Sequence, residues 1–238
     1  MLNPTRNRTI GATLSLIGLL SLSLTTTVFA QSVLIGGTGD LGSGNSFPLT
    51  VNTNGRYQQV YSGSLFPSSF SIGSISFFNN NFQPGTAVIE TANYSIHLST
   101  TSKPVNGLDT SVLSANVGAD DAVFFNGVLG GAVGPCNVFT ITGNPFLYVP
   151  SGGNLLLDIT ITGQLGNGLG FLDARNGSFT ADSSRAHNFG GGFESTGLVT
   201  QFNSPANSTV PEPGSIALLG SIGVTAGLFA LKSLRRRK

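Results

Sequence analysis

The sequence predicts an all-β fold: an antiparallel β-sandwich, for which a jelly roll is a variant. Glycine contributes 33 of the 238 residues, and Asn, Ser and Thr are abundant, as expected for short strands joined by tight turns. The 17 phenylalanines, with frequent Val, Ile and Leu, can form a hydrophobic core. Several segments alternate apolar and polar residues, and none in the central part of the chain shows capped helical periodicity.

The alternation is clearest in two segments, 87–99 and 154–162. In the first, Tyr94, Ile96 and Leu98 share one face, while Asn93, Ser95, His97 and Ser99 share the other. In the second, Leu155, Leu157, Ile159 and Ile161 face opposite to Leu156, Asp158, Thr160 and Thr162. Each pattern predicts a half-buried strand. The full set of predicted strands is 56–61, 69–78, 87–99, 122–129, 138–142, 154–162, 169–172 and 197–202.

Turn signals separate these strands, at 144–145, 150–154 and 166–168. A glycine-rich stretch, 32–55, precedes the first predicted strand. Its glycines lack the Gly-Lys-Ser/Thr ending of a phosphate loop. A calcium loop there would have only Asp40, Ser43 and Asn45 as oxygen ligands.

Residues 1–30 have the pattern of a secretory signal peptide. Arg6 and Arg8 form its basic region, and an apolar core follows over 10–24. Val28 and Ala30 place small side chains three residues and one residue before a cleavage site. The expected partner is therefore signal peptidase, with a mature chain that begins at Gln31. The alternative is an uncleaved membrane anchor.

The C-terminal end predicts a second membrane segment. A β-sandwich ectodomain over 31–203 is followed by a polar linker over 204–214 and an apolar run over 215–231. A helix of that length spans roughly 25 Å, at the short limit for a bilayer core. A basic tail, 232–238, follows and contains Arg235, Arg236, Arg237 and Lys238. These charges place the tail in the cytoplasm and the ectodomain outside.

The residues before this run form a short proline-flanked acidic motif: Val210, Pro211, Glu212, Pro213 and Gly214. The prolines favour an extended peptide, a form that a protease cleft can bind. Motif, apolar run and basic cluster together resemble the PEP-CTERM sorting signal of diderm bacteria, over about 29 of the 238 residues. The resemblance implies recognition by an exosortase, an integral-membrane cysteine transpeptidase-like enzyme. It would cut near the motif and pass the protein to the cell surface or extracellular matrix.

The ectodomain also resembles the secreted domains often carried ahead of such a tail. The likeness lies in Tyr57–Tyr61, Tyr94–Ile96 and Gly153–Ile159. It supports the fold and implies no activity.

The charge distribution argues against a nucleic-acid partner. Seven of the eleven basic residues lie in the two terminal segments, and residues 31–210 hold four basic and nine acidic residues. Binding to phosphates needs clustered cations. Cys136 is the one cysteine, so no intrachain disulfide can form, and we expect a small buried hydrophobe. A reactive thiol and an intermolecular bridge are the alternatives.

The sequence predicts no metal or cofactor site and no enzyme. His97 falls on the polar face of its strand and His187 in a loop, and we expect both to be solvated. No nucleophile-elbow pattern accompanies the many serines. Glycoside hydrolysis would need two converging carboxylates, and the sequence does not tell which of Asp120, Asp121, Asp158 and Asp173 converge. We expect a structural or adhesive component of the exopolysaccharide matrix. A carbohydrate-binding module is the alternative, and a glycoside-active enzyme is a more distant one.

Overall fold

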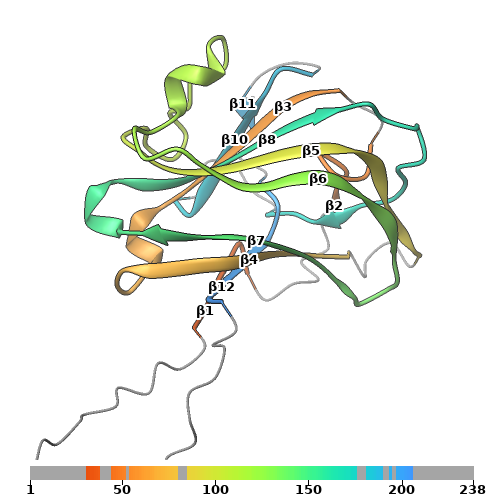
Figure 1. The fold of residues 1–238 in the computed structure, drawn as a ribbon, viewed down its shortest axis with the longest axis horizontal. Coiled ribbons are helices and arrows are strands. Elements are labelled where there is room, and N and C mark those ends of the chain that lie inside the picture. Colours follow the sequence, from red (N-terminus) through yellow and green to blue (C-terminus); the bar gives the residue numbers. More distant parts are fainter. Residues whose placement is uncertain are drawn as a thin grey trace, which may run out of the picture.

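The computed structural model shows an all-β protein built from antiparallel sheets (Figure 1). The structure describes residues 31–37, 44–51, 54–79, 85–175, 181–189, 193–194 and 197–205. Two large sheets face each other across one hydrophobic core, which is the arrangement of a β-sandwich. The jelly-roll variant stays a prediction.

The larger sheet has six strands, and every neighbouring pair in it is antiparallel. In spatial order they are β11 (Phe193–Glu194), β10 (Ser183–His187), β3 (Gly55–Tyr61), β8 (Asn154–Thr162), β5 (Ala87–Thr101) and β6 (Ala122–Val133). The strand predicted over 154–162 matches β8 at both ends.

The smaller sheet has four strands, also antiparallel throughout. They are β1 (Ser32–Ile35), β12 (Thr200–Asn203), β4 (Phe70–Phe78) and β7 (Val138–Tyr148). A two-stranded sheet pairs β2 (Gly44–Asn45) with β9 (Leu172–Asp173). Three short 3₁₀ helices lie in connections: η1 (Gly63–Leu65), η2 (Leu113–Asn116) and η3 (Pro150–Gly152).

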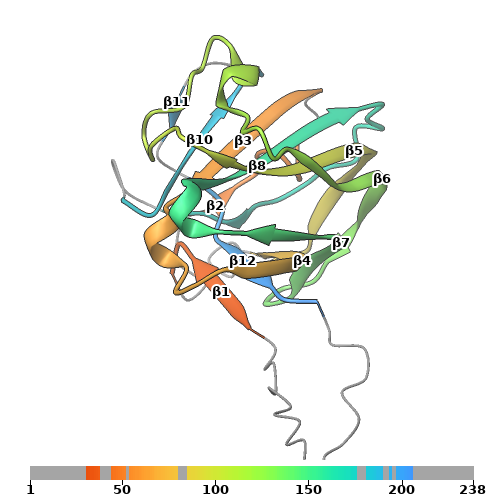
Figure 2. The same ribbon diagram turned by 60° about the vertical axis from the view of Figure 1, so that its left-hand side comes forward.

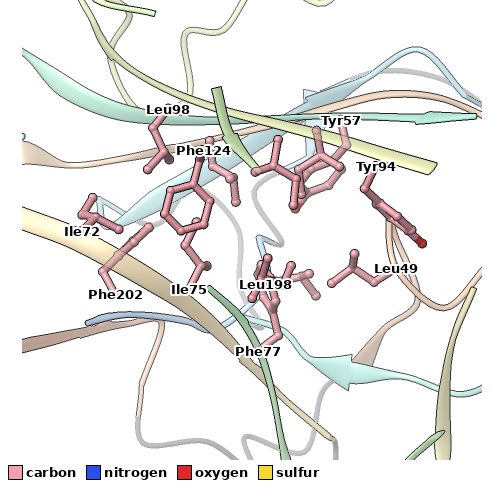
Figure 3. Packing of buried hydrophobic residues seen from close by; sticks show 14 of the residues in the cluster. Leu49, Tyr57, Ile72, Ile75, Phe77, Tyr94, Leu98, Phe124, Leu198 and Phe202 are labelled. Atoms are coloured by element: carbon pink, nitrogen blue, oxygen red, sulfur yellow. The ribbon is translucent and has the colours of Figure 1, made fainter. Parts of the chain in front are cut away.

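The core lies between the two large sheets (Figure 3). The alternating apolar residues of β5 and β8 point into it, as the sequence predicts, and meet the apolar face of β4 and Phe202 of β12. All four tyrosines are fully buried. Tyr61 packs edge-on against Phe202, with ring centroids 4.9 Å apart, and its hydroxyl lies 2.8 Å from Oγ1 of Thr200. Aromatic contacts and satisfied hydroxyls therefore join the sheets.

Strands β6 and β7 close one side of the sandwich as the chain passes from the larger sheet to the smaller. Nδ2 of Asn144 donates a hydrogen bond to the carbonyl oxygen of Val123 at 3.2 Å. A Cβ added to Gly143 would lie 2.3 Å from the carbonyl oxygen of Phe124. A residue without a side chain therefore permits this close approach.

A buried carboxylate holds the loop that follows β8. Glu90 accepts hydrogen bonds from the backbone N–H groups of Leu165, Gly166 and Gly168 at 2.8, 2.7 and 2.6 Å. Its side chain is fully buried. Buried charges are tolerated where such donors satisfy them, so the loop over 163–171 depends on Glu90.

The two ends of the described ectodomain lie side by side at the edge of the smaller sheet. Ser32, the first residue of β1, is paired with Asn203, the last residue of β12. Just outside them, the backbone N–H of Ser204 donates to the carbonyl oxygen of Gln31 at 2.8 Å. Both views show β1 beside β12 on the lower side of the molecule (Figures 1 and 2).

In the described parts of the chain, the four strands β1, β2, β10 and β11 were not predicted, and β5, β6 and β7 continue past their predicted ends. β1 lies in the glycine-rich stretch. β10 contains Arg185 and His187, in a polar segment for which the sequence predicts a loop. β7 continues past the turn signal at 144–145 because these residues lie where its register with β4 shifts, a place where a strand tolerates proline. Among the described residues no helix is long and apolar enough to cross a membrane. The predicted signal peptide and the apolar run at 215–231 lie outside those residues.

Candidate functional site

Two rows of polar side chains cross the outer face of the six-stranded sheet. Strand register places Gln58, Asp158 and His97 in the first row, on β3, β8 and β5. The second row runs from Arg56 through Thr160 and Ser95 to Asn126 on β6. Directly opposed residues in a sheet point to the same side, so the four strands build one polar surface.

Asp158 is the structural anchor of this surface. Nε of Arg56 donates to both its carboxylate oxygens, at 2.9 and 3.1 Å, and Nη2 of Arg56 also binds Oδ2. Nε2 of Gln58 donates to Oδ2 at 2.9 Å. The hydrogen bond to Asp158 is the main cause of a raised pKa for Arg56, whose side chain is 30% exposed. Asp158 lies on the outer face, as predicted, and these partners explain its burial.

A connection between β5 and β6 covers one end of this face. Nδ2 of Asn116 donates to Oε1 of Gln58 at 2.8 Å, and Gln58 donates to the carbonyl oxygen of Leu113 at 3.0 Å. Below them lies a second apolar cluster of Val60, Leu108, Leu113, Leu156 and Ala186. The connection therefore leaves the other end of the two rows, around Ser95 and His97, exposed to solvent.

At this exposed end a serine, a histidine and an aspartate are hydrogen-bonded in series. Oγ of Ser95 lies 3.2 Å from Nε2 of His97, and Nδ1 of His97 lies 2.9 Å from Oδ2 of Asp121. The side chains of His97 and Asp121 are 31% and 37% exposed. Alternation in β5 already placed Ser95 and His97 on one face. Asp121 could not be assigned to them, because only the antiparallel return of β6 brings it near.

The other carboxylates weighed for catalysis do not join a shared site. Oδ1 of Asp120 accepts a hydrogen bond from the backbone N–H of Thr100 at 2.7 Å, so it acts in a turn. The strand predicted over 169–172 ends before Asp173, but Asp173 lies in β9 and is buried. Within the described ranges no group of three or more His, Cys, Asp or Glu side chains could hold a metal ion.

The expectation that His187 is solvated was wrong. His187 lies on β10 and is 3% exposed. Its ring contacts those of Phe47 and Phe189, with centroids 5.6 and 4.8 Å away, and the two phenyl rings are 5.3 Å from each other. Burial, and next the positive charge of Arg185, lower the pKa of His187 and outweigh the opposing effect of the Phe189 backbone. This histidine is therefore neutral near pH 7. A polar residue in a serine-rich stretch gave no signal of a buried strand.

The expectation that Cys136 is buried was also wrong. It is exposed, with a φ of 59°, in the turn between β6 and β7. The backbone N–H of Asn137 donates to the carbonyl oxygen of Gly134 and closes that turn. The preceding proline and this tight turn direct the thiol toward solvent. The side chain therefore cannot pack in the hydrophobic core.

The residues expected to act in sorting lie outside the described residues. They are Val28 and Ala30 of the signal peptide, Val210 to Gly214 of the motif, and Arg235 to Lys238 of the basic cluster. Gln31 is described, and its backbone N–H donates to Oγ of Ser204 at 2.8 Å. No family model, curated protein or solved structure matched the chain.

Proposed function

We propose that this chain is an exported surface or matrix protein, sorted by exosortase-type processing at Pro211-Glu212-Pro213. The observation that carries the proposal is the order of three features in the sequence: the motif, the membrane-length apolar run and the terminal basic cluster. A signal peptide at the other end would bring the chain to the same membrane. The precursor would then be a single-pass inner-membrane protein with its ectodomain outside.

The position of the ectodomain's ends supports this proposal. Because Gln31 and Ser204 are hydrogen-bonded, both predicted membrane segments join the ectodomain at the same edge of the smaller sheet. A precursor could hold both segments in one membrane without distortion of the fold. After processing, the protein would carry the acidic charge of residues 31–210, and we infer a structural or adhesive role in the exopolysaccharide matrix.

The test of sorting is the combined substitution of Pro211, Glu212 and Pro213 by alanine in the native host. We expect the variant to stay in the inner-membrane fraction, while the unchanged protein reaches the surface fraction. Pro205→Ala, which alters a nearby proline and leaves the motif intact, is the matched control. Equal surface delivery of the motif variant and the control would refute processing at this motif.

Carbohydrate binding is the second candidate, favoured by the exposed hydroxyl and amide side chains of Ser95, Asn126 and Thr160 in one row. Such groups can hydrogen-bond sugar hydroxyls. A glycan array probed with the exported protein tests this alternative. Binding that is lost in Asn126→Ala would establish it, and an array without signal would leave the structural role.

A further inference from the structure

The exposed end of the polar surface has the arrangement of a serine hydrolase triad. In such a triad, histidine Nε2 contacts the serine hydroxyl while Nδ1 is bound to a carboxylate. Ser95, His97 and Asp121 have this order, with distances of 3.2 and 2.9 Å. A triad is recognised by geometry and roles, and not by sequence position.

We propose that Ser95 is a nucleophile for acyl transfer, with His97 as its general base and Asp121 as the positioning residue. Asp121 would hold the imidazole with its Nδ1 proton toward the carboxylate, so that Nε2 can accept the hydroxyl proton of Ser95. This proposal departs from the sequence-based expectation that the protein is not an enzyme. It does not depend on processing of the tail.

The step is the cleavage of a carboxylic ester. Oγ of Ser95 bonds to the carbonyl carbon, and its proton moves to Nε2 of His97. The ester C–O bond then breaks, and the leaving alcohol takes that proton. Water then attacks the carbonyl carbon of the acyl-serine and gives a proton to Nε2 of His97. The bond from this carbon to Oγ of Ser95 breaks, His97 returns the proton to Oγ, and a carboxylic acid leaves.

The neighbours of Ser95 can stabilise the charge that develops on the carbonyl oxygen. Thr160 and Asn126 lie directly opposite Ser95 on the two adjacent strands, and both are exposed. Their hydroxyl and amide groups are hydrogen-bond donors of the kind that form oxyanion sites.

The openness of the site indicates the class of substrate. Ser95 is partly exposed, and His97 and Asp121 are about one-third exposed on a sheet face. An acyl ester carried on a large molecule, such as an O-acylated polymer, can reach this surface, whereas an enclosed small-molecule site would bury its ligand. The site should therefore accept acyl esters with little selection for the alcohol.

The test uses a fluorophosphonate probe, which phosphonylates activated serines with loss of fluoride. The full-length protein is labelled and digested, and the modified peptides are followed in time by mass spectrometry. Ser69, which is exposed and lies immediately before β4, is the reference within the same molecule. We expect Ser95 to be modified about 10²-fold faster than Ser69, within the usual contribution of general-base catalysis.

Variants then separate the roles. His97→Gln should slow the labelling of Ser95 by about 10²-fold, and Asp121→Asn should also slow it, while hydrolysis of p-nitrophenyl acetate falls in parallel. Thr162→Ala, on the same outer face, should leave both rates unchanged. Ser95 labelling no faster than Ser69 in the unchanged protein would overturn the proposal without any variant. Equal labelling in His97→Gln would overturn it as well.

Discussion

Gln31 and Ser204 are hydrogen-bonded to each other in both directions at the edge of the four-stranded sheet. The N–H of Gln31 donates to Oγ of Ser204, and the N–H of Ser204 donates to the carbonyl oxygen of Gln31, each at 2.8 Å. The residue expected to start the mature chain is thus fixed beside the first residue of the linker. In the precursor, both membrane segments would hold the ectodomain at this edge of the four-stranded sheet. The polar face belongs to the other layer, the six-stranded sheet.

Glu90→Ala should destabilise the protein strongly. The substitution leaves the N–H groups of Leu165, Gly166 and Gly168 without their acceptor, and we expect a loss of about 3 kcal/mol in the free energy of unfolding. Denaturant unfolding measures it. Asp182→Asn is the control, because its ion pair with Arg175 is about one-third exposed and contributes at most about 1 kcal/mol. Equal losses in the two variants would contradict the account of the loop.

Acid should destabilise the native protein through His187. Its pKa is lowered in the folded state from a usual value near 6.5, by burial first and Arg185 second. Below about pH 6.5 the unfolded chain therefore binds a proton at this histidine more readily than the folded chain does. As the pH is lowered through this range, the free energy of unfolding decreases.

His187→Phe should remove this contribution while it keeps an aromatic ring in contact with Phe47 and Phe189. The measurement is the Tm of both proteins at pH 7.5 and pH 5.5. The unchanged protein should lose more Tm than the variant over this interval. Parallel losses would show that His187 is not the group that titrates.

Gly143→Ala should force β6 and β7 apart. The new Cβ would meet the carbonyl oxygen of Phe124, and overpacking of this kind costs about 1–3 kcal/mol. Gly85→Ala is the matched control, since nothing lies within 4 Å of an added Cβ there. Thermal unfolding should show a lower Tm for the first variant only. An unchanged Tm in Gly143→Ala would mean that the strands can separate freely.

Cys136 should react in the folded protein. Because its side chain is exposed in a turn, a maleimide reagent should label it as fast as it labels a small thiol at the same pH. Mass spectrometry of the native protein gives the extent of labelling. Reaction only after addition of denaturant would contradict the exposed position and restore the buried one.

The sequence predicted those parts of the fold in which local pattern and burial agree. In β8, period-two alternation corresponds to an inner face of buried Leu and Ile. β10 was not predicted because its buried residues include Ser, Arg and His. Only contacts with neighbours in the folded protein bury such polar side chains. His187 needed Phe47, from far along the chain, and the trio of Ser95, His97 and Asp121 needed the return of β6. Local pattern contains no information about such long-range pairings.

Sorting by cleavage at both ends determines the intact mass of the protein recovered from the cell surface. We expect mass spectrometry to show a chain that begins at Gln31 and lacks the basic cluster from Arg235 to Lys238. A surface protein whose mass still includes Lys238 would contradict it.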